Sequence, residues 1–142
     1  KDTSPSALIS LTGNATPTTI NTTGVAEVIA GTWVTETSSH FSTDAAGRIT
    51  YNGERQVTLN IGLRASLEPV SGTNKNLMVC IALNGVNVHS SCSVHRVDAN
   101  NPLSSNAIWQ ITFNNGDDVE GLVTNETDTT NILVSSSVLR IG

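Results

Sequence analysis

The sequence predicts a single all-β domain built as an antiparallel sandwich, and three observations predict it. The chain has 142 residues, a length that fits one domain with a core of its own. From residue 25 onward, short runs rich in β-branched residues alternate with turn signals about every 8 to 12 residues. No stretch keeps the apolar spacing of a helix for three turns.

The first 24 residues are rich in Ser, Thr, Asn and Pro, with one brief apolar patch at Leu8, Ile9 and Leu11. Such a polar segment buries too little apolar surface to hold a fold by itself. We therefore predict an extended N-terminal arm over residues 1–24, with at most one short strand in it. The β-sandwich domain is predicted over residues 25–142.

The first predicted strands of the domain cover residues 25–34 and 48–51. The clearest strand covers residues 57–67, where the odd positions are apolar and the even positions are mostly polar or Gly. This alternation is typical of a strand with one face in the core and the other face exposed. The last predicted strands, separated by polar turn sequences, cover residues 107–113, 119–123 and 132–141.

A β-hairpin is predicted between strands at residues 76–83 and 86–97. The turn between them is Asn84-Gly85, and both residue types accept the positive φ that a two-residue hairpin loop requires. This is the strongest hairpin signal in the chain.

The first strand of this hairpin should lie away from water on both of its faces. Its odd positions are strongly apolar, and its even positions carry uncharged side chains. In a two-layer sandwich only one face is internal, so a neighbouring subunit is the simplest cover for the other, although a loop or the N-terminal arm would also serve. Residues 132–134 are apolar on both sides in the same way. The residues assigned to a subunit interface are therefore Met78, Cys80, Ala82, Ile132 and Val134.

The two cysteines, Cys80 and Cys92, are predicted to be unpaired. With a two-residue loop at the hairpin turn, Cys80 lies opposite His89, and Cys92 lies opposite Leu77. Bridged Cβ atoms come within about 4.5 Å of each other, which this register does not allow. Two cysteines are also too few for a disulfide framework and lack the partners of a zinc site, so the redox compartment is left open.

Charge and hydropathy exclude two classes of partner. Twelve acidic and seven basic residues give a net charge of −5, and no run of Lys or Arg exists that would follow a phosphate backbone, so no nucleic acid is expected. The longest apolar runs are far too short to cross a bilayer, so no membrane is expected as a partner. Charged residues make up only 13% of the chain, a composition common in extracellular and particle-surface β proteins.

No catalytic, cofactor or metal site is predicted. The densest carboxylate cluster is Asp117, Asp118 and Glu120, which lacks the spacing of an EF-hand loop. We interpret it as a turn followed by a strand with Asp118 and Glu120 on its solvent face, and leave cation binding open. The imidazoles lie in no local catalytic context and are interpreted as surface or strand residues: His40, His89 and His95.

Three aromatic residues, Trp33, Trp109 and Tyr51, are the candidates for stacking against a sugar ring. Trp109 alternates with Ile111 and Phe113, so core packing is predicted for it. Trp33 is the residue for which a ligand-facing position stays open.

The order of the turn signals carries further information. In the first half of the chain it runs through Gly13-Asn14-Ala15-Thr16, Gly31-Thr32-Trp33, Phe41 and residues 47–53. It continues through Leu83-Asn84-Gly85, residues 113–119, residues 123–125 and the closing strand at 132–141. This order resembles that of the trimeric jelly rolls in virion proteins of tailed bacteriophages, whose fold is similar to the C1q and tumour-necrosis-factor (TNF) domains. The resemblance covers about residues 12–142 and rests on turn positions and strand order.

The resemblance implies a TNF/C1q-like jelly roll that forms a homotrimer about a three-fold axis, with its first and last strands near the axis. It implies a virion structural protein at the particle surface, of the capsid decoration or cement type, whose partners are copies of itself and capsid or tail proteins. The alternative is the head of a tail fibre or spike, whose loops bind a host surface receptor or glycan. No enzymatic activity and no cofactor are implied.

Overall fold

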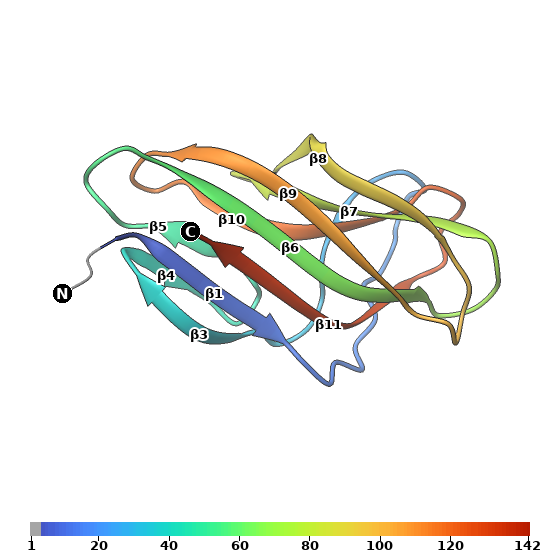
Figure 1. Cartoon of the computed structure of the whole chain (residues 1–142). Helices are drawn as coiled ribbons and strands as arrows, with labels where there is room; N and C mark the ends of the chain where they lie inside the picture. The colour runs from blue at the N-terminus through green and yellow to red at the C-terminus, as the bar shows by residue number, and fades with distance from the viewer. Residues whose placement is uncertain (1–3) are drawn as a thin grey trace.

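The computed structural model describes residues 4–142, which form two antiparallel sheets packed face to face (Figure 1). Sheet A has the strand order β3-β1-β11-β6-β9, and sheet B has the order β4-β5-β10-β7-β8, with β2 paired to β10. The strands are β1 (Ser6–Leu11), β2 (Glu27–Val28), β3 (Val34–Ser39), β4 (Phe41–Thr43), β5 (Ile49–Tyr51), β6 (Val57–Pro69), β7 (Lys75–Leu83), β8 (Val86–Val97), β9 (Leu103–Phe113), β10 (Asp118–Asn125) and β11 (Ile132–Ile141). The predicted fold class, an all-β antiparallel sandwich, is confirmed.

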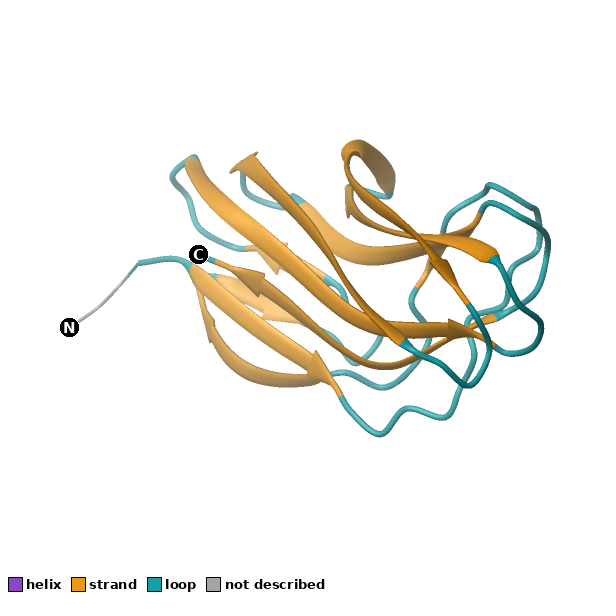
Figure 2. Ribbon diagram, turned by 45° about the vertical axis from the view of Figure 1, so that its right-hand side comes forward, coloured by secondary structure: helices purple, strands orange, loops and turns teal. Residues whose placement is uncertain are grey.

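The described residues contain only strands, turns and loops (Figure 2). None of them belongs to a helix long and apolar enough to span a membrane.

Residues 6–24 are part of the sandwich, so the predicted extended arm is not evident; residues 1–3 lie outside the described part of the chain. β1 is an interior strand of sheet A that pairs with β11 on one side and with β3 on the other. Thr18 then exchanges backbone hydrogen bonds with Ile132. β1 is thus the one short strand allowed in this segment, and its alternate residues Ala7, Ile9 and Leu11 enter the core.

Short strands replace the single strand predicted over residues 25–34. Between residues 25 and 33 only Glu27 and Val28 pair as a strand, whereas β3 begins at Val34 and continues, with β4, into a polar stretch where no strand was expected. β3 is exposed along nearly its whole length, because it is an edge strand held by backbone pairing rather than by an apolar face. The later predicted strands agree closely with β5 to β11, except that β9 begins at Leu103 rather than at residue 107.

The core lies between the two sheets. Its aromatic part is formed by Phe41, Tyr51 and Phe113, whose ring centroids are 5.1 to 6.0 Å apart. The alternation predicted along β6 is confirmed, and its buried side chains are Ile61, Leu63, Ala65 and Leu67. The intervening residues of β6 therefore face away from sheet B.

The hairpin formed by β7 and β8 has the predicted turn, with φ of 52° at Asn84 and 78° at Gly85. Beyond the turn the pairing shifts, because Ile81 lies opposite Val88 but Val79 lies opposite Ser93. Cys80 alone therefore lies opposite the bulge at residues 89–92 of β8.

A disulfide joins Cys80 to Cys92 across this bulge, so the prediction of two free thiols is wrong. The predicted register had no bulge in it. Ser91 stabilises the bulge, since its hydroxyl accepts a hydrogen bond from the backbone N–H of Ile81 at 2.9 Å and donates one to the carbonyl of Val88 at 2.6 Å. The Ser91 hydroxyl thus replaces a ladder hydrogen bond that the shifted β8 backbone does not supply.

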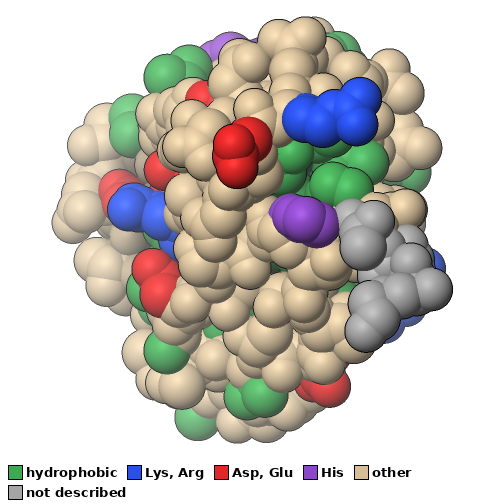
Figure 3. Space-filling view, turned by 90° about the vertical axis from the view of Figure 1, so that its left-hand side faces the viewer, with side chains coloured by type: hydrophobic (Ala, Val, Ile, Leu, Met, Phe, Trp, Pro, Cys, Tyr) green, Lys and Arg blue, Asp and Glu red, His purple; other side chains and the backbone are tan. Residues whose placement is uncertain are grey.

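The surface carries few charges, as the composition predicts. On the face shown in Figure 3, acidic and basic side chains occur singly or in small groups among uncharged polar side chains and backbone. Hydrogen-bonding groups without charge therefore make most of this surface.

Candidate functional site

The part of the outer face of sheet B around Cys80 is covered by the chain itself. Cys80, Ala82 and Leu122 form a small buried cluster on this face, and Ala26, Met78 and Cys92 pack against it. The cover is the disulfide-linked part of β8 together with the segment that leads into β2. Of the covers considered for this face of β7, a loop of the same chain is the one present.

The other two residues assigned to a subunit interface lie inside the sandwich. Ile132 and Val134 have no exposed surface and belong to the main core between the sheets. Leu133, between them, is half-buried on the outer face of sheet A, opposite Glu68. The apolar run at residues 132–134 is therefore explained without a second subunit.

The outer face of sheet A, in contrast, is open. Pairing registers align its side chains into three rows that run across the strands. The first row contains Leu8, Arg140, Gly62 and Ile108. The second row contains Ser10, Val138, Arg64 and Asn106, and the third contains Ser136, Ser66 and Ser104.

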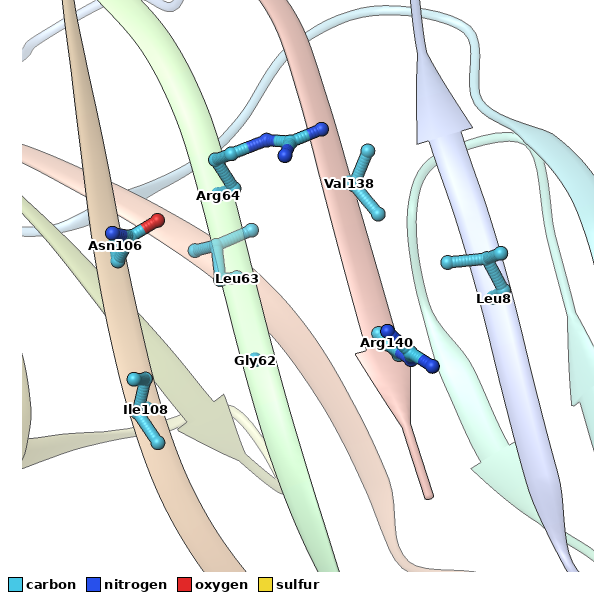
Figure 4. Close-up of a pocket in the computed structure, with 8 residues that line it drawn as sticks. All are labelled: Leu8, Gly62, Leu63, Arg64, Asn106, Ile108, Val138 and Arg140. Carbon is cyan, nitrogen blue, oxygen red and sulfur yellow. The ribbon is translucent and has the colours of Figure 1, made fainter.

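The first two rows, apart from Ser10, line an open hollow of about 590 Å³ (Figure 4). Its apolar lining comes mainly from Leu8, Ile108 and Val138, and Ile108 is 70% exposed. In Figure 4 the residues that line the hollow come from β1, β11, β6 and β9, which are neighbours in sheet A, and Gly62 lies in the middle of the group. An apolar hollow of this kind on a sheet face is typical of a surface that contacts another molecule.

Gly62 is the reason that the face is hollow there. Its register with Arg140 on one side and Ile108 on the other is unbroken, so it marks no bulge. A Cβ atom at this position would meet no atom within 4 Å. Glycine inside a strand costs about 0.5–1 kcal/mol relative to alanine and often marks a place where a ligand or another backbone approaches closely.

Two guanidinium groups, Arg64 and Arg140, flank the hollow. They are diagonal neighbours on adjacent strands, a relationship that places Cα atoms about 7–8 Å apart. Within the described part of the chain, the ion pairs involve Arg48 and Lys75 but neither of these two arginines.

A second, smaller hollow of about 140 Å³ adjoins the first, and Arg64 lines both. Its other lining residues include the hydroxyl side chains Thr12, Ser66, Ser104 and Ser136. Guanidinium and hydroxyl groups are hydrogen-bond donors, so this part of the face is suited to an anion.

Trp33, for which a ligand-facing position was left open, is buried, and Trp109, for which core packing was predicted, is partly exposed. Trp33 is only 4% exposed, and its indole ring packs so closely on Gly47 that a Cβ atom there would lie 2.6 to 2.9 Å from three ring atoms. Trp109 is 38% exposed, so its predicted core position is wrong. It does point inward, but β9 is the edge strand of sheet A and leaves its ring incompletely covered.

The acidic cluster forms the turn interpreted from the sequence, and it also forms an ion pair that was not predicted. Asp117 accepts hydrogen bonds from the Asn114 backbone N–H and from the Asn84 side chain. Arg48 lies 4.0 Å from Asp118 and 3.6 Å from Glu120. Glu120 is only 6% exposed, so its predicted place on a solvent face is wrong. No group of three or more metal-binding side chains occurs among residues 4–142.

Comparison with known proteins identifies the fold. No family model matches the sequence, and no curated protein matches it. Among solved structures, the chain is similar to the PRD1 vertex protein P5, with a TM-score of 0.63, 10% identity, and 99% of this chain and 98% of that chain covered.

Two further structures have nearly the same extent of similarity. The globular domain of the zebrafish complement 1qA protein gives a TM-score of 0.60 at 9% identity, covering 98% of this chain and 96% of that chain. Murine APRIL gives a TM-score of 0.58 at 8% identity, covering 96% of this chain and 98% of that chain. The chain therefore has the TNF/C1q-like jelly-roll fold expected from the order of its turns. Domains with this fold are typically binding or structural modules rather than enzymes, and they typically form homotrimers.

Proposed function

We propose that this chain is a structural subunit at the surface of a virion, a homotrimer of the capsid decoration or cement type. The outer face of sheet A is turned towards the other copies, and the remaining surface contacts capsid or tail proteins. The function is mechanical: many apolar and hydrogen-bonding contacts, repeated by symmetry, hold the particle together through avidity.

The observation that carries the proposal is the difference between the two outer faces. The chain covers the part of sheet B around Cys80 with its own bulge and with the segment leading into β2. It leaves sheet A open, with an apolar hollow at Gly62 and with Ile108 70% exposed. Gly62 lies inside a strand and has no side chain, although the space above it is empty in the single chain. A second copy that occupies this space explains the glycine.

Two features support a place on the outside of a particle. The similarity to the PRD1 vertex protein extends over nearly the whole of both chains. The disulfide between Cys80 and Cys92 is of a kind that persists in oxidising surroundings, which include virion surfaces.

A receptor- or glycan-binding head is the second candidate function. The observation in its favour is Trp109, an aromatic ring that is 38% exposed on edge strand β9. An aromatic face of this kind stacks on a sugar ring. Binding to a glycan array that Trp109→Ala abolishes, with unchanged assembly, would favour this candidate.

The experiment that tests the proposal has two parts. Light scattering should give about three times the chain mass of 14.9 kDa, as expected for a closed three-fold assembly. Electron microscopy of particles labelled with an antibody against the chain should then locate it on the particle surface. A chain that stays monomeric at high concentration, or that is absent from particles, would refute the proposal.

A further inference from the structure

We infer that Arg64 and Arg140 form a binding site for a tetrahedral oxyanion, phosphate or sulfate, on the outer face of sheet A. The inference rests on the proposed function in one respect, since the site lies on the surface that is turned towards the other copies. The ion binds as a free inorganic anion and lowers the repulsion between guanidinium groups when this surface is covered.

The first argument is the arrangement of like charges. Arg64 and Arg140 are diagonal neighbours on β6 and β11, within reach of one small anion. Arg64 extends from β6 towards Val138 on β11, and Arg140 lies beyond Val138 on the same strand (Figure 4). Two cations this close repel each other, and the repulsion increases when water is displaced from them.

The second argument is that two carboxylates near this face, Glu36 and Glu68, are hydrogen-bonded to groups other than the arginines. Glu36 accepts a hydrogen bond of 2.6 Å from the Ser10 hydroxyl. Glu68 accepts one of 3.2 Å from the backbone N–H of Asn100. Neither forms an ion pair with Arg64 or Arg140 among the ion pairs of residues 4–142.

The third argument is the chemistry of the surroundings. Around Arg64, the smaller hollow carries no carboxylate and is lined in part by hydroxyl side chains, those of Thr12, Ser66, Ser104 and Ser136. Guanidinium groups bind phosphate and sulfate through paired N–H donors, and neighbouring hydroxyl groups add further donors. The hollow beside Arg140 is apolar, which strengthens electrostatic attraction once a second copy covers it.

The test measures phosphate binding and assembly separately. Phosphate is titrated calorimetrically into the wild-type chain and into Arg64→Gln and Arg140→Gln, at constant ionic strength set with chloride. Arg55→Gln is the matched control, because Arg55 is an exposed arginine in the loop between β5 and β6. Each of the two site variants should weaken phosphate binding at least tenfold, and the control should leave it unchanged.

Sedimentation equilibrium provides the second measurement. For each ion taken up on assembly, the assembly constant of the wild type should rise about tenfold per tenfold rise in free phosphate, between the dissociation constant of the assembled form and the weaker one of the single chain. Both site variants should lose this dependence and should assemble better than the wild type when phosphate is absent, because the repulsion is relieved.

Other outcomes distinguish a failure of the oxyanion site from a failure of the proposed function. A wild-type trimer whose assembly and calorimetry ignore phosphate and sulfate overturns the oxyanion site and leaves the proposed function standing. Weaker assembly of both variants without any phosphate effect also overturns it, because an acidic side chain of the second copy is then the partner. A monomeric chain that binds phosphate through both arginines supports the site and refutes the proposed assembly.

Discussion

The disulfide between Cys80 and Cys92 crosses a bulge, joining the one residue of β7 that has no regular partner to the last residue of the bulged segment of β8. Unfolded but unreduced protein should therefore show no reactive thiols, and reduction should release two per chain. Closing a loop of this length stabilises a fold by about 2–3 kcal/mol in the chain-entropy model. The double variant Cys80→Ala/Cys92→Ala should lose about that much unfolding free energy, measured with urea.

The same bulge allows a matched control for the disulfide. Ser91→Ala removes the hydroxyl that bonds both Ile81 and Val88 but leaves the cysteines in place. It should cost about 1–3 kcal/mol, because it leaves a buried backbone N–H unpaired. Two free thiols in the oxidised protein, or a double variant as stable as the parent, would contradict the assigned register.

Met78→Asp should weaken the fold of each chain rather than the contact between chains. Met78 is half-buried against the cluster that contains Cys80 and Leu122, on the face of sheet B that the chain covers for itself. Placing a carboxylate there should cost about 1–3 kcal/mol of unfolding free energy. The urea midpoint should fall at every protein concentration, whereas Val86→Asp, at a position 67% exposed, should leave it nearly unchanged. A lower urea midpoint of Met78→Asp only at concentrations where the chain assembles would instead show that Met78 lies in a subunit interface.

Acid should destabilise the loop that connects β10 to β11. The pKa of Asp128 is held well below its usual range, chiefly by a hydrogen bond from Lys75 and then by the backbone N–H of Thr130. Because the folded pKa lies below the unfolded one, the stabilisation is complete above the unfolded pKa of about 3.9 and is lost as the pH falls below it. Urea midpoints should therefore fall less steeply between about pH 4 and pH 2 in Asp128→Asn than in the wild type.

The control for this pH dependence is Glu54→Gln, which removes one carboxylate from an exposed loop position. It should keep the wild-type slope. An Asp128→Asn variant with an unchanged slope would show that the contact with Lys75 contributes nothing to the acid sensitivity.

The parts of the fold that could be predicted from the sequence are those where local chemistry decides the structure. The alternation along β6 identifies its buried face, and Asn84-Gly85 fixes the hairpin turn. The bulge in β8 could not be predicted in this way. The bulge depends on the hydroxyl of Ser91, which replaces a backbone donor and acceptor, and on the disulfide between Cys80 and Cys92. No local sequence pattern indicates either contact.

The candidate site was missed for a related reason. Gly62, Arg64 and Arg140 are ordinary residues in the sequence, and they become a group only through the register of β11 with β6. Met78 and Val134 gave a stronger apolar signal, but one packs under the bulge and the other lies in the core. An apolar pattern shows that a residue is covered and does not show by what. The signal that was present was a glycine inside the clearest strand of the chain.

Gly62→Val tests that signal directly. The backbone at this position is ordinary strand, and a Cβ atom meets open space, so valine should fit the single chain without strain. Replacing glycine with a β-branched residue should raise the unfolding free energy of the monomer by about 0.5–1 kcal/mol. In the assembled protein the added methyl groups occupy the hollow that a second copy needs, so the trimer should dissociate at concentrations where the wild type stays assembled. Ser90→Val, an exposed position on the bulge of sheet B, is the control and should leave assembly unchanged. Sedimentation equilibrium and urea unfolding on the same samples separate the two effects, and a Gly62→Val chain that assembles like the wild type would show that no second copy approaches this face.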